Sequence, residues 1–278
     1  MKRPRETKPA PARWGFIGAG KMAGALIQGL IRAGLASPAT ITASDPHEPA
    51  RVAIATSAGI HVSDDNREVA RTADVLVLAV KPQQMRAVFE EVQPDLSART
   101  LVISVAAGTT LATLADGLGP DCRLVRVMPN TAALVGEAAA GYCLGPNATA
   151  DDEATVRAFL NAVGRAHAVP ESLLDAVTGL AGSGPAFVFL MIEALSDGGV
   201  RVGLPRETAT ALAAQTVLGA ARMVLETGLH PGVLKDQVAS PAGTTIAGLR
   251  VLEERATRGA FLDAVDAATR RAKELGAS

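Results

Sequence analysis

Trp14-Gly15-Phe16-Ile17-Gly18-Ala19-Gly20-Lys21-Met22-Ala23 is the stretch that decides the fold of this chain. A short apolar strand over residues 13–18 leads into two closely spaced glycines, and a helical pattern follows over residues 21–33. In a dinucleotide-binding turn the first glycine, here Gly18, makes the sharp bend, and the second, here Gly20, lets the backbone approach a pyrophosphate. Because glycine-rich turns are common, the strand before and the helix after these glycines are what predict a nucleotide site.

Strand and helix patterns alternate along the chain beyond this turn. Residues 74–80 form an apolar run of the kind found in a parallel strand that helices cover on both faces. Alternation of this sort predicts an α/β fold with a Rossmann-type doubly wound sheet. The expected strands are residues 13–18, 41–44, 74–80, 100–105 and 123–128, and the expected helices between them are residues 21–33, 48–58, 82–92 and 111–118.

The pattern changes near residue 170, beyond which alanine is abundant and strand signals disappear. We expect a flexible tail over residues 1–12, a dinucleotide-binding domain over residues 13–168 and an all-α domain over residues 169–278. An alanine-rich helical domain needs more cover than it gives itself and commonly dimerises, which predicts a homo-oligomer. The expected helices of this half are residues 173–180, 185–198, 206–227, 233–238, 245–255 and 261–275.

The composition argues against several classes of function. The chain of 278 residues has 27 basic and 28 acidic side chains, which argues against a nucleic-acid binder driven by bulk charge. Two cysteines make neither a disulfide framework nor a closed zinc site, and the histidines show no metal spacing, so we expect no metal. No apolar run reaches the roughly 18–20 residues of a membrane span, and the basic N-terminus lacks the apolar core of a signal peptide. We therefore expect a cytoplasmic protein that contacts no membrane.

The choice of cofactor depends on the end of the second expected strand. Asp45 lies there, where a carboxylate accepts the ribose 2′-hydroxyl of NADH and repels the 2′-phosphate of NADPH. Arg51 is instead suited to a phosphate, and Asp45 before Pro46 is also typical of a turn or a helix cap. We expect NADH or NADPH, with a preference for NADH. Asn66 precedes another helical stretch, where it either caps that helix or contacts the adenosine end of the cofactor.

Other strands end at the same edge of the predicted sheet, where ligands of open α/β sheets bind. Val80-Lys81-Pro82 ends the third expected strand, and Lys81 is either a neighbour of the cofactor or a solvated lysine. Val105-Ala106-Ala107-Gly108 and Met128-Pro129-Asn130-Thr131 end two later strands, and small residues there suit a nicotinamide that lies close to the backbone. Asn130 is expected to hydrogen-bond the ligand, although a turn-forming role fits nearly as well.

The second half contains a helix start with almost no charge, Ser240-Pro241-Ala242-Gly243-Thr244-Thr245. Proline and glycine set a turn, after which free backbone N–H groups and two threonine hydroxyls are able to hold a carboxylate. Gly182-Ser183-Gly184-Pro185 marks another helix start, where Ser183 is an N-cap, part of the site, or both. No nucleophile elbow, zinc-protease motif or phosphate-loop lysine occurs, so a cofactor must carry the reaction. Together these features predict a reductase that acts on a small anionic substrate.

The sequence resembles the pyrroline-5-carboxylate reductase family from about Trp14 to its end. The most specific segments are Val177–Phe187, which reads VTGLAGSGPAF, and Leu234–Thr245, which reads LKDQVASPAGTT. Residues 79–82 and 126–131 match as well, whereas the first glycine motif is shared with many dehydrogenases.

The resemblance implies reduction of L-1-pyrroline-5-carboxylate to L-proline with NADH or NADPH, the last step of proline biosynthesis. It also implies that the C-terminal helices interlock into a homodimer, from which higher assemblies are built. It places the substrate carboxylate in the Ser240–Thr245 turn, the hydroxyl of Thr245 beside the imine nitrogen as the catalytic group, and Glu171 near the substrate. The expected substrate residues are Glu171, Ser183, Ser240, Gly243, Thr244 and Thr245, and the expected cofactor residues are Ile17, Gly18, Gly20, Lys21, Met22, Asp45, Asn66, Ala79, Val80, Lys81, Pro82, Ala106, Ala107 and Asn130.

Two residues depart from the family pattern. Ala242 stands where the family usually has a second glycine, which restricts the turn if this position needs a positive φ. Asp45 replaces the small polar residue that NADPH-using relatives often carry, which favours NADH.

Three alternatives stay open. A 3-hydroxyacid dehydrogenase is the rival enzyme, but such enzymes keep a lysine a few residues after the glycine-rich helix start of the second domain. Ala186-Phe187-Val188 follows that start here, with no lysine nearby. The second alternative is a nucleotide-sensing or pyridoxal-phosphate-handling module without turnover, and the third is action on a six-membered cyclic imine.

Overall fold

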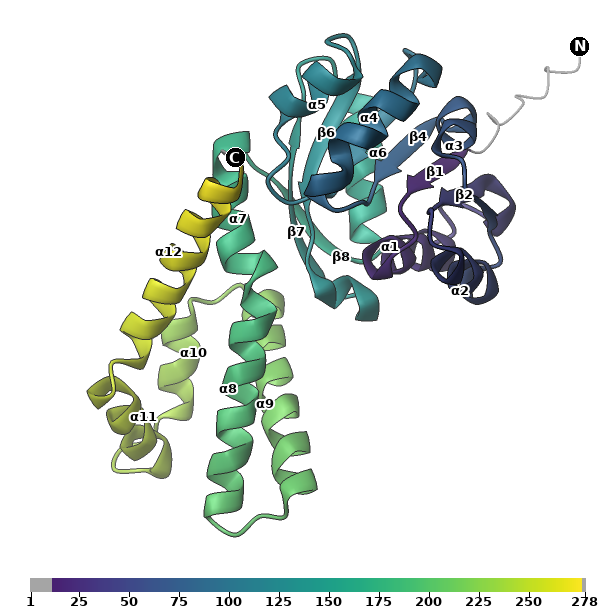
Figure 1. The fold of residues 1–278 in the computed structure, drawn as a ribbon. Helices are drawn as coiled ribbons and strands as arrows, with labels where there is room; N and C mark the ends of the chain where they lie inside the picture. The colour runs from purple at the N-terminus through teal and green to yellow at the C-terminus, as the bar shows by residue number, and fades with distance from the viewer. Residues whose placement is uncertain (1–11, 277–278) are drawn as a thin grey trace, which may run out of the picture. The chain divides into compact units, whose positions relative to one another are not determined.

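The computed structural model describes residues 12–276, and contacts within the chain divide it into two compact units (Figure 1). One unit reaches to Gly182 and includes the chain from Ala268 onward, and the other is Ser183–Ala267. The expected flexible tail lies outside the described residues except for Ala12. We expect the domain boundary after Ala168, where the strand pattern gives way to a helical pattern. The last strand of the sheet does end at Ala168. As a division into domains it stays a prediction.

A sheet of eight strands forms the centre of the first unit, counted over residues 12–276. The strand order is β3-β2-β1-β4-β5-β6-β7-β8, and neighbouring strands are parallel except for β6 and β7. The order reverses between β1 and β4, and ligands of doubly wound sheets bind at the carboxyl ends beside such a reversal. The predicted Rossmann-type sheet is confirmed. The strands are β1 (Trp14–Ile17), β2 (Ile41–Ser44), β3 (His61–Ser63), β4 (Val75–Leu78), β5 (Leu101–Ser104), β6 (Arg123–Met128), β7 (Ala138–Leu144) and β8 (Gly164–Ala168).

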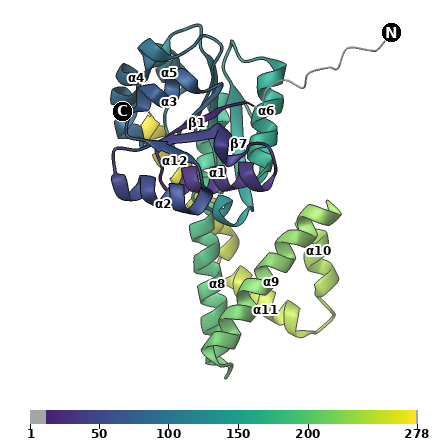
Figure 2. The same ribbon diagram turned by 90° about the vertical axis from the view of Figure 1, so that its right-hand side faces the viewer.

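Helices cover both faces of this sheet because its strands are apolar on both sides. Side chains of α1, α2 and α6 form one core, in which Phe159 packs against Trp14 with ring centroids 5.0 Å apart. Side chains of α3, α4 and α5, such as Phe89, form the other core. In Figure 2 these three helices lie on one side of the strands and α6 lies on the other. The helices of the first unit are α1 (Lys21–Arg32), α2 (Glu48–Ala58), α3 (Asn66–Thr72), α4 (Met85–Val92), α5 (Leu111–Leu118), α6 (Ala150–Asn161) and α7 (Leu174–Val177).

Four elements of the first unit were not expected from the sequence, namely β3, β7, β8 and α6. β3 has only three residues, and β7 contains three alanines and a glycine, which are poor strand formers. β7 is a strand because it pairs antiparallel with β6 and buries Tyr142, whose hydroxyl donates to Glu153 Oε1 at 3.0 Å. Pairing of this kind is set by distant parts of the chain, so a local pattern does not reveal it.

The segment after the last strand packs back onto the sheet. A Cβ at Gly141 of β7 would lie 2.9 Å from Val177 Cγ1 of α7, so glycine is what allows this close approach. The helix expected over residues 173–180 is in fact interrupted: α7 passes into a π-helical turn, η6 (Thr178–Gly182). The hydroxyl of Thr178 donates to the carbonyl of Leu174 at 2.9 Å. π-helical turns are uncommon and occur frequently at functional sites.

The second unit consists of helices that leave many apolar side chains exposed. α8 and α9 pack against each other, and α10 contacts α9 (Figure 1). Phe189 of α8 is 66% exposed and Leu262 of α12 is 68% exposed. The helices are α8 (Gly184–Arg201), α9 (Arg206–Thr227), α10 (Pro231–Val238), α11 (Thr244–Glu254) and α12 (Thr257–Gly276), of which the last also enters the first unit.

The expectation that no stretch suits a membrane span needs correction. Residues 171–201 and 206–227 are long and apolar enough to cross a membrane by length and composition alone. No continuous apolar run of that length occurs in either stretch, but both combine many apolar and small residues with few charges. Apolar helices that pack within a protein pass the same test.

Candidate active site

Loops at the carboxyl ends of β4, β5 and β6 surround a cavity of about 300 Å³ in the first unit. Its walls are mostly small or apolar, which suits a flat ring that lies against the backbone. The structure brings together here one predicted residue of α1 and those of the three strand ends, that is Met22, Ala79, Val80, Lys81, Pro82, Ala106, Ala107 and Asn130. Lys21, the first residue of α1, instead lines a separate cavity beside Gly20.

Other residues in the wall of this cavity were not among the predicted site residues. Four of them belong to the strand-end segments named above, residues 105–108 and 128–131, namely Val105, Met128, Pro129 and Thr131. A prediction that included every residue of these two segments would have contained all four. Gly182 comes from η6, far along the chain, and the only signal for it was the glycine-rich run that it begins.

The glycine turn after β1 is tightly constrained on one side and open on the other. Gly18 has φ +95°, and a Cβ there would lie 2.7 Å from the carbonyl oxygen of Ala79. A Cβ at Gly20 would meet nothing within 4 Å. Gly20 is also the N-cap position of α1, and no side chain caps the first N–H groups of that helix. The turn therefore offers open space and free donors to an anionic group. Ile17 is 1% exposed in the apolar core and its carbonyl accepts from the N–H of Ala79 at 2.8 Å, so its side chain is not available to a ligand.

Asp45 stands directly beside this turn. Its Oδ2 accepts a hydrogen bond from the N–H of Ala19 at 2.9 Å, and its Oδ1 accepts one from the N–H of His47 at 2.9 Å. The guanidinium of Arg51 donates to the carbonyl of Asp45 at 2.7 Å. The Asp45 carboxylate, expected to favour NADH, and the Arg51 guanidinium, suited to a phosphate, thus lie next to each other. The bond to His47 also gives Asp45 the turn-forming role that was its alternative.

Asn66 does not cap α3, which corrects one of its two expected roles. The cap is Asp65, whose Oδ1 accepts from the N–H of Arg67 at 2.8 Å. The side-chain oxygen of Asn66 accepts from Ser44 Oγ at 2.7 Å, and its Nδ2 donates to Glu91 at 2.5 Å. These bonds hold the Asn66 amide against the end of β2. Contact with the adenosine end of a cofactor stays a prediction.

Glu171 belongs to a partly buried charged cluster of the first unit. Its Oε1 accepts from the N–H of Leu111, the first residue of α5, at 2.7 Å and from Arg126 at 3.1 Å. Arg126 also lies 3.5 Å from Asp175, and its side chain is only 7% exposed. Cys143 pairs with Arg126 across the strands, and burial raises the pKa of its thiol to about 11. That thiol is protonated at neutral pH, so it is not an activated nucleophile.

The Ser240–Thr245 turn leads into α11 in the second unit. The N–H of Gly243 donates to the carbonyl of Ser240 at 3.0 Å, and a Cβ at Gly243 would overlap Ser240 Oγ. Ala242 has φ +55°, so the positive φ that the missing glycine would favour is indeed required. Gly243 is the N-cap position, and no side chain caps the helix, which leaves its first N–H groups available. Ser183 is the N-cap position of α8, but its side chain makes no capping bond.

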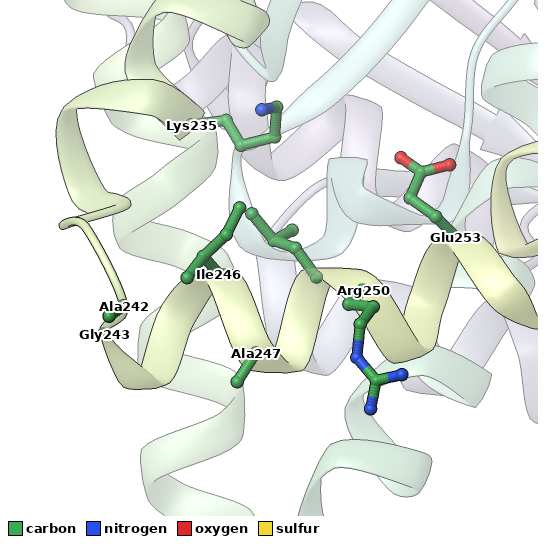
Figure 3. Close-up of a pocket in the computed structure, with 8 residues that line it drawn as sticks. Lys235, Ala242, Gly243, Ile246, Ala247, Arg250 and Glu253 are labelled. Carbon is green, nitrogen blue, oxygen red and sulfur yellow. The ribbon is translucent and has the colours of Figure 1, made fainter.

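A second cavity, of about 520 Å³, lies beside this turn (Figure 3). Lys235 from α10 and Glu253 from α11 extend to the same side of α11, whereas Arg250 extends to the other. Lys235 lies 2.6 Å from Asp236 and Arg250 lies 2.6 Å from Glu254, so each cation has an acidic partner. Neither cation is among the site residues expected from the sequence. The lining residues are Lys235, Ala242, Gly243, Ile246, Ala247, Leu249, Arg250 and Glu253.

Comparison with known proteins assigns the family. A family model described as pyrroline-5-carboxylate reductase dimerisation matches residues 171–275, and one described as NADP oxidoreductase, coenzyme F420-dependent, matches residues 13–108. A pyrroline-5-carboxylate reductase of Methanosarcina acetivorans is 55% identical over 94% of this chain and 97% of its own. The chain belongs to the pyrroline-5-carboxylate reductase family.

Solved pyrroline-5-carboxylate reductases have the same fold. The enzyme of Coxiella burnetii is 39% identical with a TM-score of 0.90, and that of Plasmodium falciparum, with NADP bound, is 34% identical with a TM-score of 0.86. Each alignment covers 95% of this chain and 98% of the other. The predicted order of a Rossmann-type sheet followed by a helical dimerisation domain is confirmed. The exposed apolar helices match that dimerisation domain, which supports a homo-oligomer.

Replacing Ala242 by glycine should stabilise the protein. A left-handed conformation costs a residue with a side chain about 1–2 kcal/mol, and glycine avoids this at the expense of about 0.5–1 kcal/mol of unfolded-state entropy. We expect Ala242→Gly to raise the free energy of unfolding by about 0.5–1 kcal/mol, measured by urea denaturation. Ala247→Gly, within α11, is the control and should lower it by about 1 kcal/mol. Equal losses in both variants would contradict the strain at Ala242.

Proposed function

We propose that this chain reduces L-1-pyrroline-5-carboxylate to L-proline with NADH or NADPH, the last step of proline biosynthesis. The observation that carries the proposal is the 55% identity, over 94% of the chain, to a reductase of that name. The glycine turn and the cavity at the sheet edge support it, because they suit a dinucleotide.

The residues at the sheet edge fit NAD(P)H. The open space over Gly20 and the uncapped start of α1 suit a pyrophosphate. The small side chains of Ala79, Ala106 and Ala107 leave room in the cavity for a nicotinamide ring. When bound, NAD(P)H supplies the hydride. Apart from Asn130, whose side-chain amide bonds to the backbone of Ala181 and Ala139, the cofactor residues expected from the sequence are our proposed contacts.

The chain's own task is to hold and orient the substrate. Addition of hydride to a C=N bond is easiest on the protonated iminium, so the substrate nitrogen brings its own proton and no strong general acid is needed. The imine carbon gains the hydride, and the nitrogen becomes the secondary amine of proline. Correct orientation of the reactants contributes about 7 kcal/mol or more toward lowering the barrier.

The turn before α11 is the proposed substrate site. The N–H groups at the uncapped helix start, with Ser240, Gly243 and Thr244, hold the substrate carboxylate. The hydroxyl of Thr245 lies beside the imine nitrogen and hydrogen-bonds to it. Because this hydroxyl carries no charge, it does not repel the positively charged iminium. Glu171 and Ser183 complete the proposed set of substrate residues.

The finer proposals concern cofactor preference, assembly and location. Asp45 beside the glycine turn favours NADH, since its carboxylate repels a 2′-phosphate. The exposed apolar faces of α8 to α12 favour a homodimer, and we propose a higher assembly of such dimers on the family resemblance alone. We propose that the enzyme works in the cytoplasm.

The proposed reaction is tested by following NADH and NADPH oxidation with and without pyrroline-5-carboxylate. We expect oxidation of both cofactors to depend on the cyclic imine and L-proline to appear in equal amount. The six-membered piperideine carboxylate serves as the alternative substrate. If neither cofactor is oxidised in an imine-dependent way, the proposed function is refuted. The alternative of a nucleotide-sensing or pyridoxal-phosphate-handling module without turnover is then favoured.

Loss of the Thr245 hydroxyl should weaken catalysis without unfolding the protein. We expect Thr245→Ala to lower kcat/KM for the imine by an amount equivalent to about 1–3 kcal/mol, the worth of one hydrogen bond in the transition state. Thr245→Ser keeps a hydroxyl and should retain most of the activity. Unchanged steady-state kinetics in the alanine variant would remove Thr245 from the mechanism.

Removing the charge of Asp45 should shift the enzyme toward NADPH. Asp45→Asn keeps the shape of the side chain and removes its charge, but its amide accepts through one oxygen only, so one of the two bonds, from the N–H of Ala19 or of His47, is lost as well. We expect the NADH to NADPH ratio of kcat/KM to fall by about 10-fold, equivalent to about 1.4 kcal/mol. Asp64→Asn removes the same charge from an exposed position and should leave the ratio unchanged. If the NADH to NADPH ratio changes equally in both variants, the cofactor preference depends on the overall charge of the protein and not on Asp45.

A further inference from the structure

Asn130 connects three segments of the first unit through its side chain. It lies in the loop after β6, in the wall of the cavity at the strand ends, and is only 8% exposed. Its Nδ2 donates to the carbonyl oxygen of Ala181 at 3.0 Å, and its Oδ1 accepts from the N–H of Ala139 at 3.2 Å. Both polar atoms of the amide therefore bond to backbone groups rather than pointing unpaired into the cavity.

The bond to Ala181 matters because of where that residue lies. Ala181 is in the π-helical turn η6, immediately before Gly182, which lines the same cavity. Carbonyl groups near the end of a helical segment lack partners within it, and Asn130 supplies one here. A Cβ at Gly182 would lie 2.6 Å from Met128 Cε, so this part of the wall is already close-packed.

We propose that Asn130 is a positioning residue for hydride transfer. By holding the Ala181 carbonyl it fixes the wall that Gly182 and Met128 form around the nicotinamide, and so it fixes the orientation of the ring. This inference rests on the proposed function and refines the expectation that Asn130 bonds the cofactor directly. The groups that suit the pyrophosphate and ribose lie elsewhere, at Gly20 and Asp45. Loss of the Ala181 bond should therefore lower turnover much more than cofactor affinity.

The variant Asn130→Asp separates the two bonds of this side chain. A carboxylate retains an oxygen that accepts from the N–H of Ala139 but presents an acceptor, not a donor, to the carbonyl of Ala181. At pH 8 we expect kcat to fall by about 10- to 100-fold, as for a misplaced reacting group, while the Kd for NADH or NADPH changes by less than about 3-fold. The primary isotope effect with 4-deuterated cofactor should increase, because hydride transfer becomes slower than the other steps.

Lowering the pH should rescue this variant. A buried carboxylate beside a carbonyl has a raised pKa, and its protonated form regains an O–H that donates to Ala181. The ratio of variant to wild-type kcat should therefore rise as the pH falls from 8 to 5. Asn147→Asp is the matched control, because Asn147 Nδ2 also donates to a backbone carbonyl, that of Pro120 at 2.7 Å, on an exposed loop. Its ratio should stay near one throughout.

Four outcomes would overturn the proposal. Cofactor Kd rising in proportion to the loss of kcat/KM would make Asn130 a direct ligand. Normal kcat per folded enzyme with a lowered Tm would make it merely structural, and an equal loss in Asn147→Asp would make the effect unspecific. The fluorescence of bound NADH reports on the ring without any substrate, so it separates this proposal from the proposed function. Even if the wild type fails to reduce the imine, altered emission in Asn130→Asp with an NADH Kd that changes by less than about 3-fold supports the proposal, and unchanged emission overturns it.

Discussion

The close approach of β1 and β4 at Gly18 is the constraint on which the candidate site depends. A side chain at Gly18 would lie 2.7 Å from the carbonyl of Ala79, and the N–H of Gly18 bonds to the carbonyl of Ser44 at 2.8 Å. The turn is therefore held between the two neighbouring strands at the point where the sheet order reverses. This places the start of α1 and the end of β4 beside each other. An anion-binding helix start and a cavity for a flat ring then lie along one sheet edge.

The parts of the fold that sequence reasoning predicted are those with a local cause. The strands of the parallel core have continuous apolar runs, and the glycine turn has its own spacing, so the doubly wound sheet followed by helices was foreseeable. β7 and β8 were not, because their residues become strands only through pairing with β6 and with each other. The π-helical turn that ends α7 was also missed.

The same distinction applies to the candidate site. The strand-end loops were found because their position follows from the topology, and the residues within them line one cavity. Gly182 was missed because tertiary packing, and no spacing, brings η6 to that cavity. The role of Asn66 as a cap was wrong because Asp65 supplies the carboxylate one residue earlier. The assignment of individual residues to substrate and cofactor stays a prediction, since contacts within the protein do not identify what a free group binds.

The exposed apolar faces of the helical unit have a consequence for how the protein folds. α11 contains no buried residue, and among its apolar side chains Val251 and Leu252 are 46% and 51% exposed. A helix gains most of its stability from covering such a face, so a single chain keeps little of that free energy to itself. Folding of the helical unit is then linked to association by mass action, and its melting temperature depends on protomer concentration. Newly made chains at low concentration would carry these helices as their least stable part.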